Sequence, residues 1–282
     1  MKKITLSSPI VSAAWLAEHL DHPDIIILDA SIKKVTASDH VSVTSQIKNA
    51  RFFDIKNTFS DKTNSIPNML PTPEVFAKGC EELGISSDHT IIIYDTLGIY
   101  SSPRAWWMFK TMGHENVAVL DGGLPVWVKS GYPTTSVEKR SHFSTTHFKT
   151  SFRPEHVASV TDIMNSIHHT DNCILDARSK GRFEATAPEP RADLKGGHIP
   201  NSISLPYTSV LSDDGTILPT AQLQSLFNSL PIANKKLIFS CGSGITACII
   251  LLASQLAGYP MGVIYDGSWS EWGQLPNVPI TS

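Results

Sequence analysis

The sequence predicts an α/β protein made of two tandem copies of one domain, each a parallel sheet flanked by helices. Short β-branched runs alternate with segments of helical periodicity, which is typical of parallel strands joined by crossover helices. The runs at residues 25–28 and 91–94 are apolar without alternation, as expected for strands covered on both faces. Segments of the first half also recur in the second half at a nearly constant spacing.

Three pairs of segments carry this repeat: residues 28–31 with 175–178, 93–95 with 239–241, and 120–123 with 265–268. The offsets lie between 145 and 147 positions, which a duplicated domain explains most simply. We expect a first domain over residues 1–138, a linker over 139–155 and a second domain over 156–282. The stretch around the linker is rich in Ser, Thr and His and lacks periodicity.

Composition and charge exclude several classes of protein. The chain has 282 residues, enough for two domains with their own cores, and 41% of them are hydrophobic. Its formal net charge of −3 and the lack of a Lys- or Arg-rich stripe argue against a nucleic-acid partner. The longest apolar run, residues 247–253, is far shorter than the roughly 20 residues that span a bilayer, so we expect a buried helix and no membrane partner.

The cysteines and the first residues indicate a reducing, cytoplasmic location. Residues 7–9 (Ser-Ser-Pro) interrupt the first apolar stretch, so we expect no cleaved secretion signal, and residues 12–20 instead predict a capped first helix. The four cysteines, Cys80, Cys173, Cys241 and Cys248, suit neither a metal knuckle nor a redox dithiol. The histidines also lack metal-ligand spacing, and no nucleotide-binding loop is present, so we expect neither a metal nor a cofactor.

One loop carries the pattern of a reactive thiol. Residues 236–240 predict a buried strand and Ile245 to Leu256 a helix, which leaves Cys241 in a tight turn at the carboxyl end of a strand. The glycines of this turn allow successive N–H groups to form an anion nest at a helix N-terminus. Such a nest favours a thiolate over a thiol, and Ser243 and Thr246 add hydroxyl groups. The alternative is that Cys241 is a small core residue, as we expect for Cys173 and Cys248. In the first half, Asp95 stands where the second half has Cys241.

At this point the chain resembles a known family, the tandem rhodanese-like sulfurtransferases, and among them the 3-mercaptopyruvate sulfurtransferases. The matching segments are residues 52–55, 102–108, 197–200, the Cys241 loop and 266–269. The loop, Cys-Gly-Ser-Gly-x-Thr, is the most specific of them, because thiosulfate sulfurtransferases carry basic residues just after the cysteine. A compact dianion such as thiosulfate profits from charge beside the nucleophile, whereas mercaptopyruvate has its carboxylate far from its sulfur.

The resemblance implies an enzyme that moves sulfur from 3-mercaptopyruvate through a Cys241 persulfide to a thiol or cyanide acceptor and releases pyruvate. The acceptor would be a small thiol or a thioredoxin-like protein. Cys241 and Ser243 would be catalytic, and the substrate contacts would come from Arg182, Arg191, Gly242, Gly244, Ile245 and Thr246. From the bare sequence alone, a surface ion-pair residue with Glu184 or Glu189 as its partner is the more ordinary interpretation of either arginine.

The family pattern breaks in the first half. Family members commonly have an acid and a histidine there that form a relay with the serine of the loop. Alignment through residues 52–55 and 69–71 places Lys56 at the acid position and Asn68 at the histidine position. Asn68 can hydrogen-bond Ser243 but cannot take its proton, so a thiosulfate enzyme stays open as an alternative.

Two further alternatives come from other classes of protein. A phosphatase related to this fold would need an arginine six residues after the nucleophile, where this chain has Ala247. A non-catalytic binding module is the other alternative, and the first half, with Asp95 in place of the thiol, fits it by itself.

Overall fold

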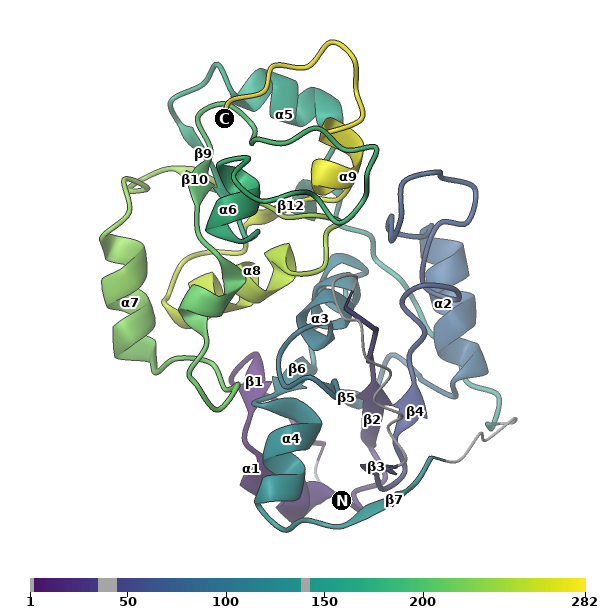
Figure 1. The fold of residues 1–282 in the computed structure, drawn as a ribbon. Coiled ribbons are helices and arrows are strands. Elements are labelled where there is room, and N and C mark those ends of the chain that lie inside the picture. Colours follow the sequence, from purple (N-terminus) through teal and green to yellow (C-terminus); the bar gives the residue numbers. More distant parts are fainter. Residues whose placement is uncertain (1–2, 35–44, 138–142) are drawn as a thin grey trace. The chain divides into compact units, whose positions relative to one another are not determined.

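The computed structural model describes residues 3–34, 45–137 and 143–282. It divides into two compact units (Figure 1). The first unit comprises Met1–Lys62, Leu70–Arg153 and Asp213–Ile217, and the second comprises Thr63–Met69, Pro154–Ser212 and Leu218–Ser282. Thr63–Met69, from the first half of the chain, therefore belongs to the second unit, and Asp213–Ile217, from the second half, belongs to the first unit. Residues 138–142, at the start of the expected linker, lie outside the described residues.

The first unit contains a five-stranded parallel sheet. Its strands lie in the order β1 (Ile10–Val11), β6 (Val117–Leu120), β5 (Thr90–Tyr94), β2 (Ile25–Asp29) and β4 (Arg51–Phe52). Its helices are α1 (Ala13–His19), α2 (Pro73–Glu82), α3 (Ser102–Thr111) and α4 (Gly123–Lys129). A separate antiparallel pair joins β3 (Ser45–Ile47) to β7 (Thr134–Ser136).

The second unit repeats this arrangement. Its parallel strands lie in the order β8 (Val157–Ala158), β12 (Val263–Tyr265), β11 (Lys236–Ser240), β9 (Asn172–Asp176) and β10 (Ile203–Ser204). Its α-helices are α5 (Val160–Ser166), α6 (Lys180–Phe183), α7 (Thr220–Asn228), α8 (Ala247–Leu256) and α9 (Ser268–Trp272), with 3₁₀ turns η1 (Pro154–His156) and η2 (Tyr207–Val210). Each strand has its counterpart at the same place in the first sheet, which confirms the predicted fold class of two α/β domains.

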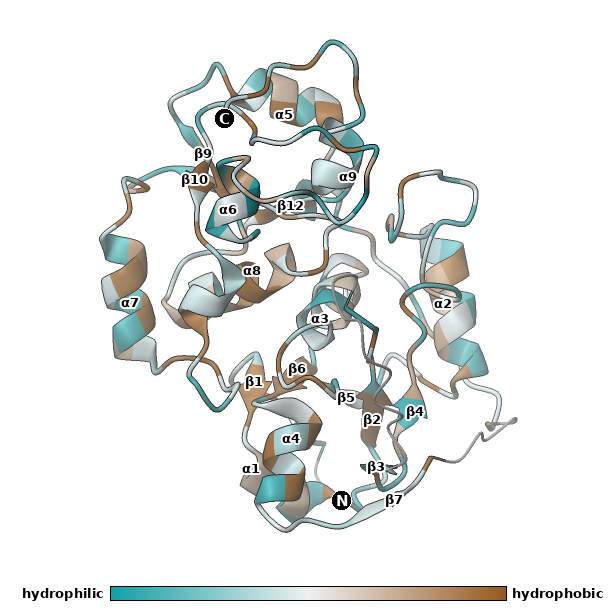
Figure 2. Cartoon of the chain, viewed as in Figure 1, coloured by the Kyte–Doolittle hydropathy of each residue, from teal (hydrophilic) through white to brown (hydrophobic). Residues whose placement is uncertain are grey.

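The central strands are buried because their side chains are apolar on both faces. All five residues of β5 are buried, as are the first four of β2 and the last four of β11. Figure 2 shows hydrophobic residues along β2, whereas α7 carries hydrophobic and hydrophilic stripes. The predicted apolar helix is α8, whose residues from Ala247 to Ser254 are all buried. It packs against β11, β12, α7 and η2 of its own unit.

The first helix begins where the sequence predicts. The hydroxyl of Ser12 accepts a hydrogen bond from the amide of Trp15 at 3.1 Å, which satisfies an N–H group of the first turn of α1. Within the described residues, none of the helices is both long and apolar enough to cross a bilayer.

The surroundings of His114 predict that the stability of the first unit depends on pH. The residue follows α3 and is only 6% exposed, and its ring lies 5.8 Å from that of Phe109 and 5.6 Å from that of Phe148. Burial lowers the pKa of His114 from 6.5 to about 4, because the apolar surroundings disfavour the imidazolium. The unfolded chain therefore binds a proton in a pH range where the folded chain does not.

We expect full stability above pH 6.5 and a loss as the pH falls towards about 4. The shift corresponds to about 3 kcal/mol at the acid end. The substitution His114→Gln should flatten this part of the profile, measured by urea unfolding between pH 7 and pH 4. The exposed His169→Gln is the matched control, and an unchanged slope in His114→Gln would contradict the assignment.

Candidate active site

β11 ends next to the residue that the sequence singles out. Ser240, its last residue, pairs with Asp176 at the end of β9, and α8 begins at Ala247. Residues 241–246 therefore form the predicted turn between strand and helix. The helix begins two residues after the predicted start at Ile245. The reason is that the amide of Cys248 bonds the carbonyl of Ile245 at 3.2 Å, three residues back, so the first turn is tighter than an α-turn.

Cys241, the first residue of this turn, is almost completely buried. Its exposure is 1%, and the half-buried side chains of Ser243 and Thr246 and the buried Ile245 follow it. Gly244 has a φ of +74°, in the left-handed region that a residue with a Cβ rarely adopts. The glycine at this position therefore allows the chain to reverse between the strand and the helix.

The turn leaves several backbone donors available. Within the part of the chain that the structure describes, the amides of Gly242, Ser243, Ile245 and Thr246 have no hydrogen-bond acceptor. Unsatisfied N–H groups at the start of a helix attract negative charge. The loop thus supplies donors for an anion at or near the sulfur of Cys241.

The first unit shows what the corresponding turn binds. The buried carboxylate of Asp95 accepts hydrogen bonds through one oxygen, Oδ2, from the amides of Tyr100, Ser101 and Ser102, each at 2.9 Å. The hydroxyl of Ser102 donates to the same oxygen at 2.7 Å. In the first unit, the carboxylate of Asp95 therefore satisfies these amide and hydroxyl donors. The second unit has a thiol at this place instead.

A segment around the start of α9 holds the Cys241 turn. The amide of Trp269 donates to the carbonyl of Cys241 at 3.0 Å, and that of Ser270 donates to the carbonyl of Gly242 at 2.8 Å. The hydroxyl of Ser268 accepts the amides of Cys241 and Gly244, at 3.2 and 3.1 Å. Sequence reasoning gave these serines no role, although residues 266–269 stood out as a family motif.

A buried ion network lies beside the turn. Arg178 bonds both carboxylate oxygens of Asp176, with Nη2 2.7 Å from Oδ2, and its Nη1 lies 2.8 Å from Oε1 of Glu189. Its guanidinium also stacks on the ring of Trp269, 4.1 Å from the centroid. Burial by itself lowers the pKa of Arg178, but Asp176 and Glu189 outweigh it and raise the pKa, so the guanidinium stays charged.

Arg182 is the second partner of Glu189. Its Nη2 lies 2.5 Å from Oε2 of Glu189, whose side chain is 1% exposed, and its own side chain is 21% exposed. A Cβ placed on Gly242 would lie 3.0 Å from this Nη2, so the guanidinium borders the turn. The ion pair expected as the alternative for this arginine is therefore present, and it orients Arg182 next to the Cys241 turn.

Arg191 reaches the turn through a serine. Its Nη1 donates to the hydroxyl of Ser270, which in turn donates to the carbonyl of Gly242 at 2.5 Å. Among the residues that the structure describes, no carboxylate lies within ion-pair distance of Arg191. It also lines a pocket of about 290 Å³, whose lining residues all lie between 185 and 196. Arg191 therefore brings a positive charge that no described carboxylate neutralises.

Lys56 and Asn68, which the alignment places at the relay positions and which could form a wall of the site from the first half, differ in their surroundings. Asn68 belongs to the second compact unit, and its Nδ2 donates to the hydroxyl of Ser243 at 3.2 Å. This is the hydrogen bond that the sequence allows for Asn68. Lys56 is an exposed residue of the first unit, and its role stays a prediction.

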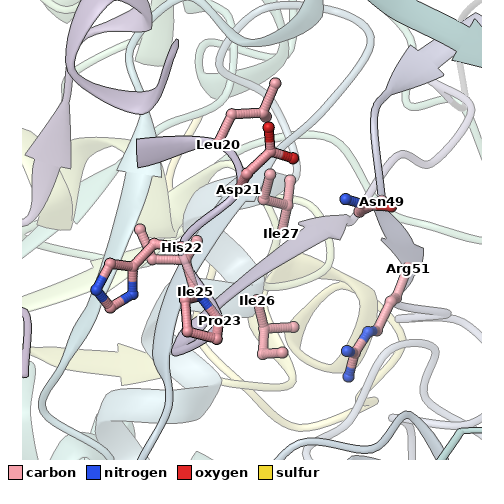
Figure 3. A pocket seen from close by; sticks show the side chains of 9 residues that line it. All are labelled: Leu20, Asp21, His22, Pro23, Ile25, Ile26, Ile27, Asn49 and Arg51. Atoms are coloured by element: carbon pink, nitrogen blue, oxygen red, sulfur yellow. The ribbon is translucent and has the colours of Figure 1, made fainter. Parts of the chain in front are cut away.

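A second hollow, of about 280 Å³, lies at the amino end of β2 (Figure 3). Its charged groups already have partners within the chain. Asp21 pairs with Lys48 at 2.8 Å, and Arg51 donates to the carbonyl of Gly84 at 2.9 Å. Since ligands of open parallel sheets bind at the carboxyl ends of the strands, this hollow is a poorer candidate than the Cys241 turn.

Comparison with known proteins agrees with this geometry. The model of the family described as "Rhodanese-like domain" matches residues 12–130 and again residues 158–275. The chain belongs to the rhodanese family, with two tandem domains. Each match contains one of the two strand-to-helix turns, the one with Asp95 and the one with Cys241.

Relatives that match almost the full chain narrow the class of enzyme. The 3-mercaptopyruvate sulfurtransferase of Escherichia coli (strain K12) is 39% identical, with 96% of both chains covered. The mitochondrial thiosulfate/3-mercaptopyruvate sulfurtransferase 1 of Arabidopsis thaliana is also 39% identical, over 99% of this chain and 79% of its own. The crystal structure of SseA from Escherichia coli superimposes with a TM-score of 0.82 at 38% identity, covering 94% of this chain and all of that one. This rhodanese is a sulfurtransferase of the mercaptopyruvate and thiosulfate family.

Proposed function

We propose that this rhodanese transfers sulfur from 3-mercaptopyruvate through a persulfide on Cys241 to a thiol or cyanide acceptor and releases pyruvate. One observation carries the proposal. A cysteine stands in a turn with four unsatisfied amides, and the turn at the same place in the other unit binds a carboxylate. A persulfide anion can take the place in the second unit that the Asp95 carboxylate fills in the first.

The reaction consists of two sulfur transfers. The Cys241 thiolate attacks the sulfur of mercaptopyruvate, an S–S bond forms, and the C–S bond breaks. The electron pair of the C–S bond leaves with the carbon, which gives the enolate of pyruvate. This enolate takes up the proton of the mercaptopyruvate thiol at its carbon atom. In the second step the acceptor thiolate attacks the outer sulfur of the persulfide, the S–S bond breaks, and Cys241 leaves as a thiolate again. With cyanide as the acceptor the product is thiocyanate.

The charges beside the turn favour a donor with one negative charge. Arg182 is neutralised by Glu189, and Arg178 by Asp176, so these four groups carry no net charge. In the described part of the second unit, Arg191 then supplies a further cation, which is linked to the carbonyl of Gly242 through the hydroxyl of Ser270. A single carboxylate, as in mercaptopyruvate, matches this balance better than a dianion does.

Thiosulfate is the second candidate donor. Asn68 bonds Ser243 but cannot act as a base, so the step that a serine relay would assist has no proton acceptor at this contact. A relative named thiosulfate sulfurtransferase, from Bos taurus, is 35% identical over 93% of this chain. Neutral Gly242 and Ser243 after the cysteine argue for mercaptopyruvate as the main donor.

The acceptor and the compartment are further parts of the proposal. We propose a small thiol or a thioredoxin-like protein as the acceptor, because a persulfide passes its sulfur to a thiolate without a further cofactor.

All four cysteines are free, which fits a reducing compartment such as the cytoplasm. The first unit, with Asp95 in the turn, contributes no nucleophile of its own at that place.

The nucleophile is tested by Cys241→Ser. We expect the turnover of mercaptopyruvate to fall by at least about 10³-fold, because the sulfur has no other acceptor in the turn. The gain of one sulfur atom, detected by intact-protein mass spectrometry after incubation with the donor, should disappear as well. Cys80→Ala, which removes a buried thiol of the first unit, should keep both. Persistence of both signals in Cys241→Ser would rule out the proposed mechanism.

The charge balance is tested by Glu189→Gln. This change leaves Arg182 without its counter-charge, so the site gains one net positive charge. Because Coulomb attraction scales with the charge of the donor, the attraction to the thiosulfate dianion grows twice as much as the attraction to the mercaptopyruvate monoanion. The ratio of kcat/KM for thiosulfate to that for mercaptopyruvate should rise about fivefold or more, equivalent to about 1 kcal/mol.

Glu184→Gln is the matched control for this experiment. It removes the same charge nearby, from an exposed side chain that pairs with Lys180 at 3.6 Å. The donor ratio should stay within about twofold, because exposed pairs are screened by water. An equal rise of the ratio in both variants, or none in Glu189→Gln, would show that Glu189 does not set the donor preference.

A further inference from the structure

Ser268 stands out as a buried serine whose hydroxyl makes all of its hydrogen bonds to backbone groups. The side chain is fully buried, and Oγ donates to the carbonyl of Tyr265 at 2.8 Å. The same oxygen accepts the amides of Cys241 at 3.2 Å and of Gly244 at 3.1 Å. A hydroxyl has one donor and two acceptor positions, so that of Ser268 is saturated. It is therefore not available to donate to a sulfur and acts on the turn alone.

The backbone of Ser268 lies where a glycine is expected. Its φ is +50°, in the left-handed region that residues with a Cβ adopt at a cost. The equivalent residue of the first unit is Gly123, with a φ of +55°, so both copies have the same local conformation. A strained conformation that persists in a buried position is compensated by an interaction that needs it. The two hydrogen bonds to the Cys241 turn are that interaction.

The first unit has no room for such a hydroxyl. A Cβ placed on Gly123 would collide with the carbonyl oxygens of Asp95 and Gly98. The backbone bond is nevertheless the same in both copies, because the amide of Leu124 donates to the carbonyl of Asp95 at 3.0 Å, as Trp269 does to Cys241. The copy with the thiol carries the serine, and the copy without the thiol carries a glycine.

We propose that Ser268 is a positioning residue that fixes the Cys241 turn in the form that holds a sulfur anion. By binding the amides of Cys241 and Gly244, it determines how the intervening and following amides are presented. The free amides of Gly242, Ser243, Ile245 and Thr246 remain for the sulfur. This role rests on the proposed persulfide of Cys241 for its catalytic consequence, but the effect on the turn does not depend on the donor.

The test is Ser268→Gly in the full chain. Glycine suits the φ of this position, and the relieved strain offsets part of the cost of the lost hydrogen bonds, so the chain should stay folded with a modestly lower melting temperature. The hydrogen bonds to the turn are lost, and the amides of residues 241–246 should exchange with deuterium at least several-fold faster. Persulfide formation from mercaptopyruvate, measured in a single turnover by intact mass, should slow roughly 10- to 100-fold, as misplacement of a reacting group does. Ser268→Ala should slow it equally and lower the melting temperature further, because alanine keeps the strained φ of this position.

Ser254→Ala is the matched control. It removes another fully buried serine hydroxyl, which donates to the carbonyl of Leu251 within α8 and not to the turn. The rate of amide hydrogen–deuterium exchange in residues 241–246 and the rate of persulfide formation should both match those of the parent protein. Unchanged exchange in Ser268→Gly would overturn the positioning role, and so would faster exchange with an unchanged rate of persulfide formation. If the parent protein forms no persulfide while Ser268→Gly exchanges faster, the positioning role stands and the proposed function falls.

Discussion

The backbone amides at the start of the helix after the central strand are the constraint on which both units depend. A helix leaves its first N–H groups without intrahelical acceptors, and a buried turn cannot leave all of them without a partner at no cost. The first unit satisfies them with the carboxylate of Asp95. In the second unit Ser268 binds the amides of Cys241 and Gly244 in the turn before the helix, and the amides of Gly242, Ser243, Ile245 and Thr246 have no acceptor among the described residues. The same fold therefore gives one turn that binds its own carboxylate and one turn whose amides can bind an anion from outside the chain.

The buried ion network supplies the second condition for the site. Glu189 is shared between Arg178, which is fully buried, and Arg182, which is partly exposed beside Gly242. Breaking such a buried network costs more than its formation gains, so its members hold one another in place. Arg182 is therefore oriented but neutralised, whereas Arg191 has no carboxylate partner among the described residues. One arginine, Arg182, is thus fixed in position by an ion pair, and another, Arg191, carries the charge that no described carboxylate neutralises.

Much of this could be predicted from the sequence, because the signals are local. The run at 236–240 predicts β11 at its observed bounds, and the repeat predicts two sheets with matching strand order. The hydrogen bond between Asn68 and Ser243 also agrees with the alignment of the family motif. The helix start at Ala247 instead of Ile245 depends on two tight hydrogen bonds that periodicity does not reveal.

What the sequence could not show depends on contacts between distant residues. Ser268 bonds amides that lie 24 and 27 positions before it, and nothing in its own neighbourhood predicts its left-handed backbone. The affiliation of Thr63–Met69 with the second unit, which brings Asn68 to Ser243, is likewise a tertiary property. Comparison of the two copies in one chain supplies the missing signal. Gly123 begins the helix that contacts the Asp95 turn, and Ser268 begins the helix that contacts the Cys241 turn, and only at Gly123 do the carbonyls of the turn exclude a side chain. A thiol placed at Asp95 would therefore lack a hydroxyl like that of Ser268, so under the proposed mechanism the nucleophile and its support would have to change together.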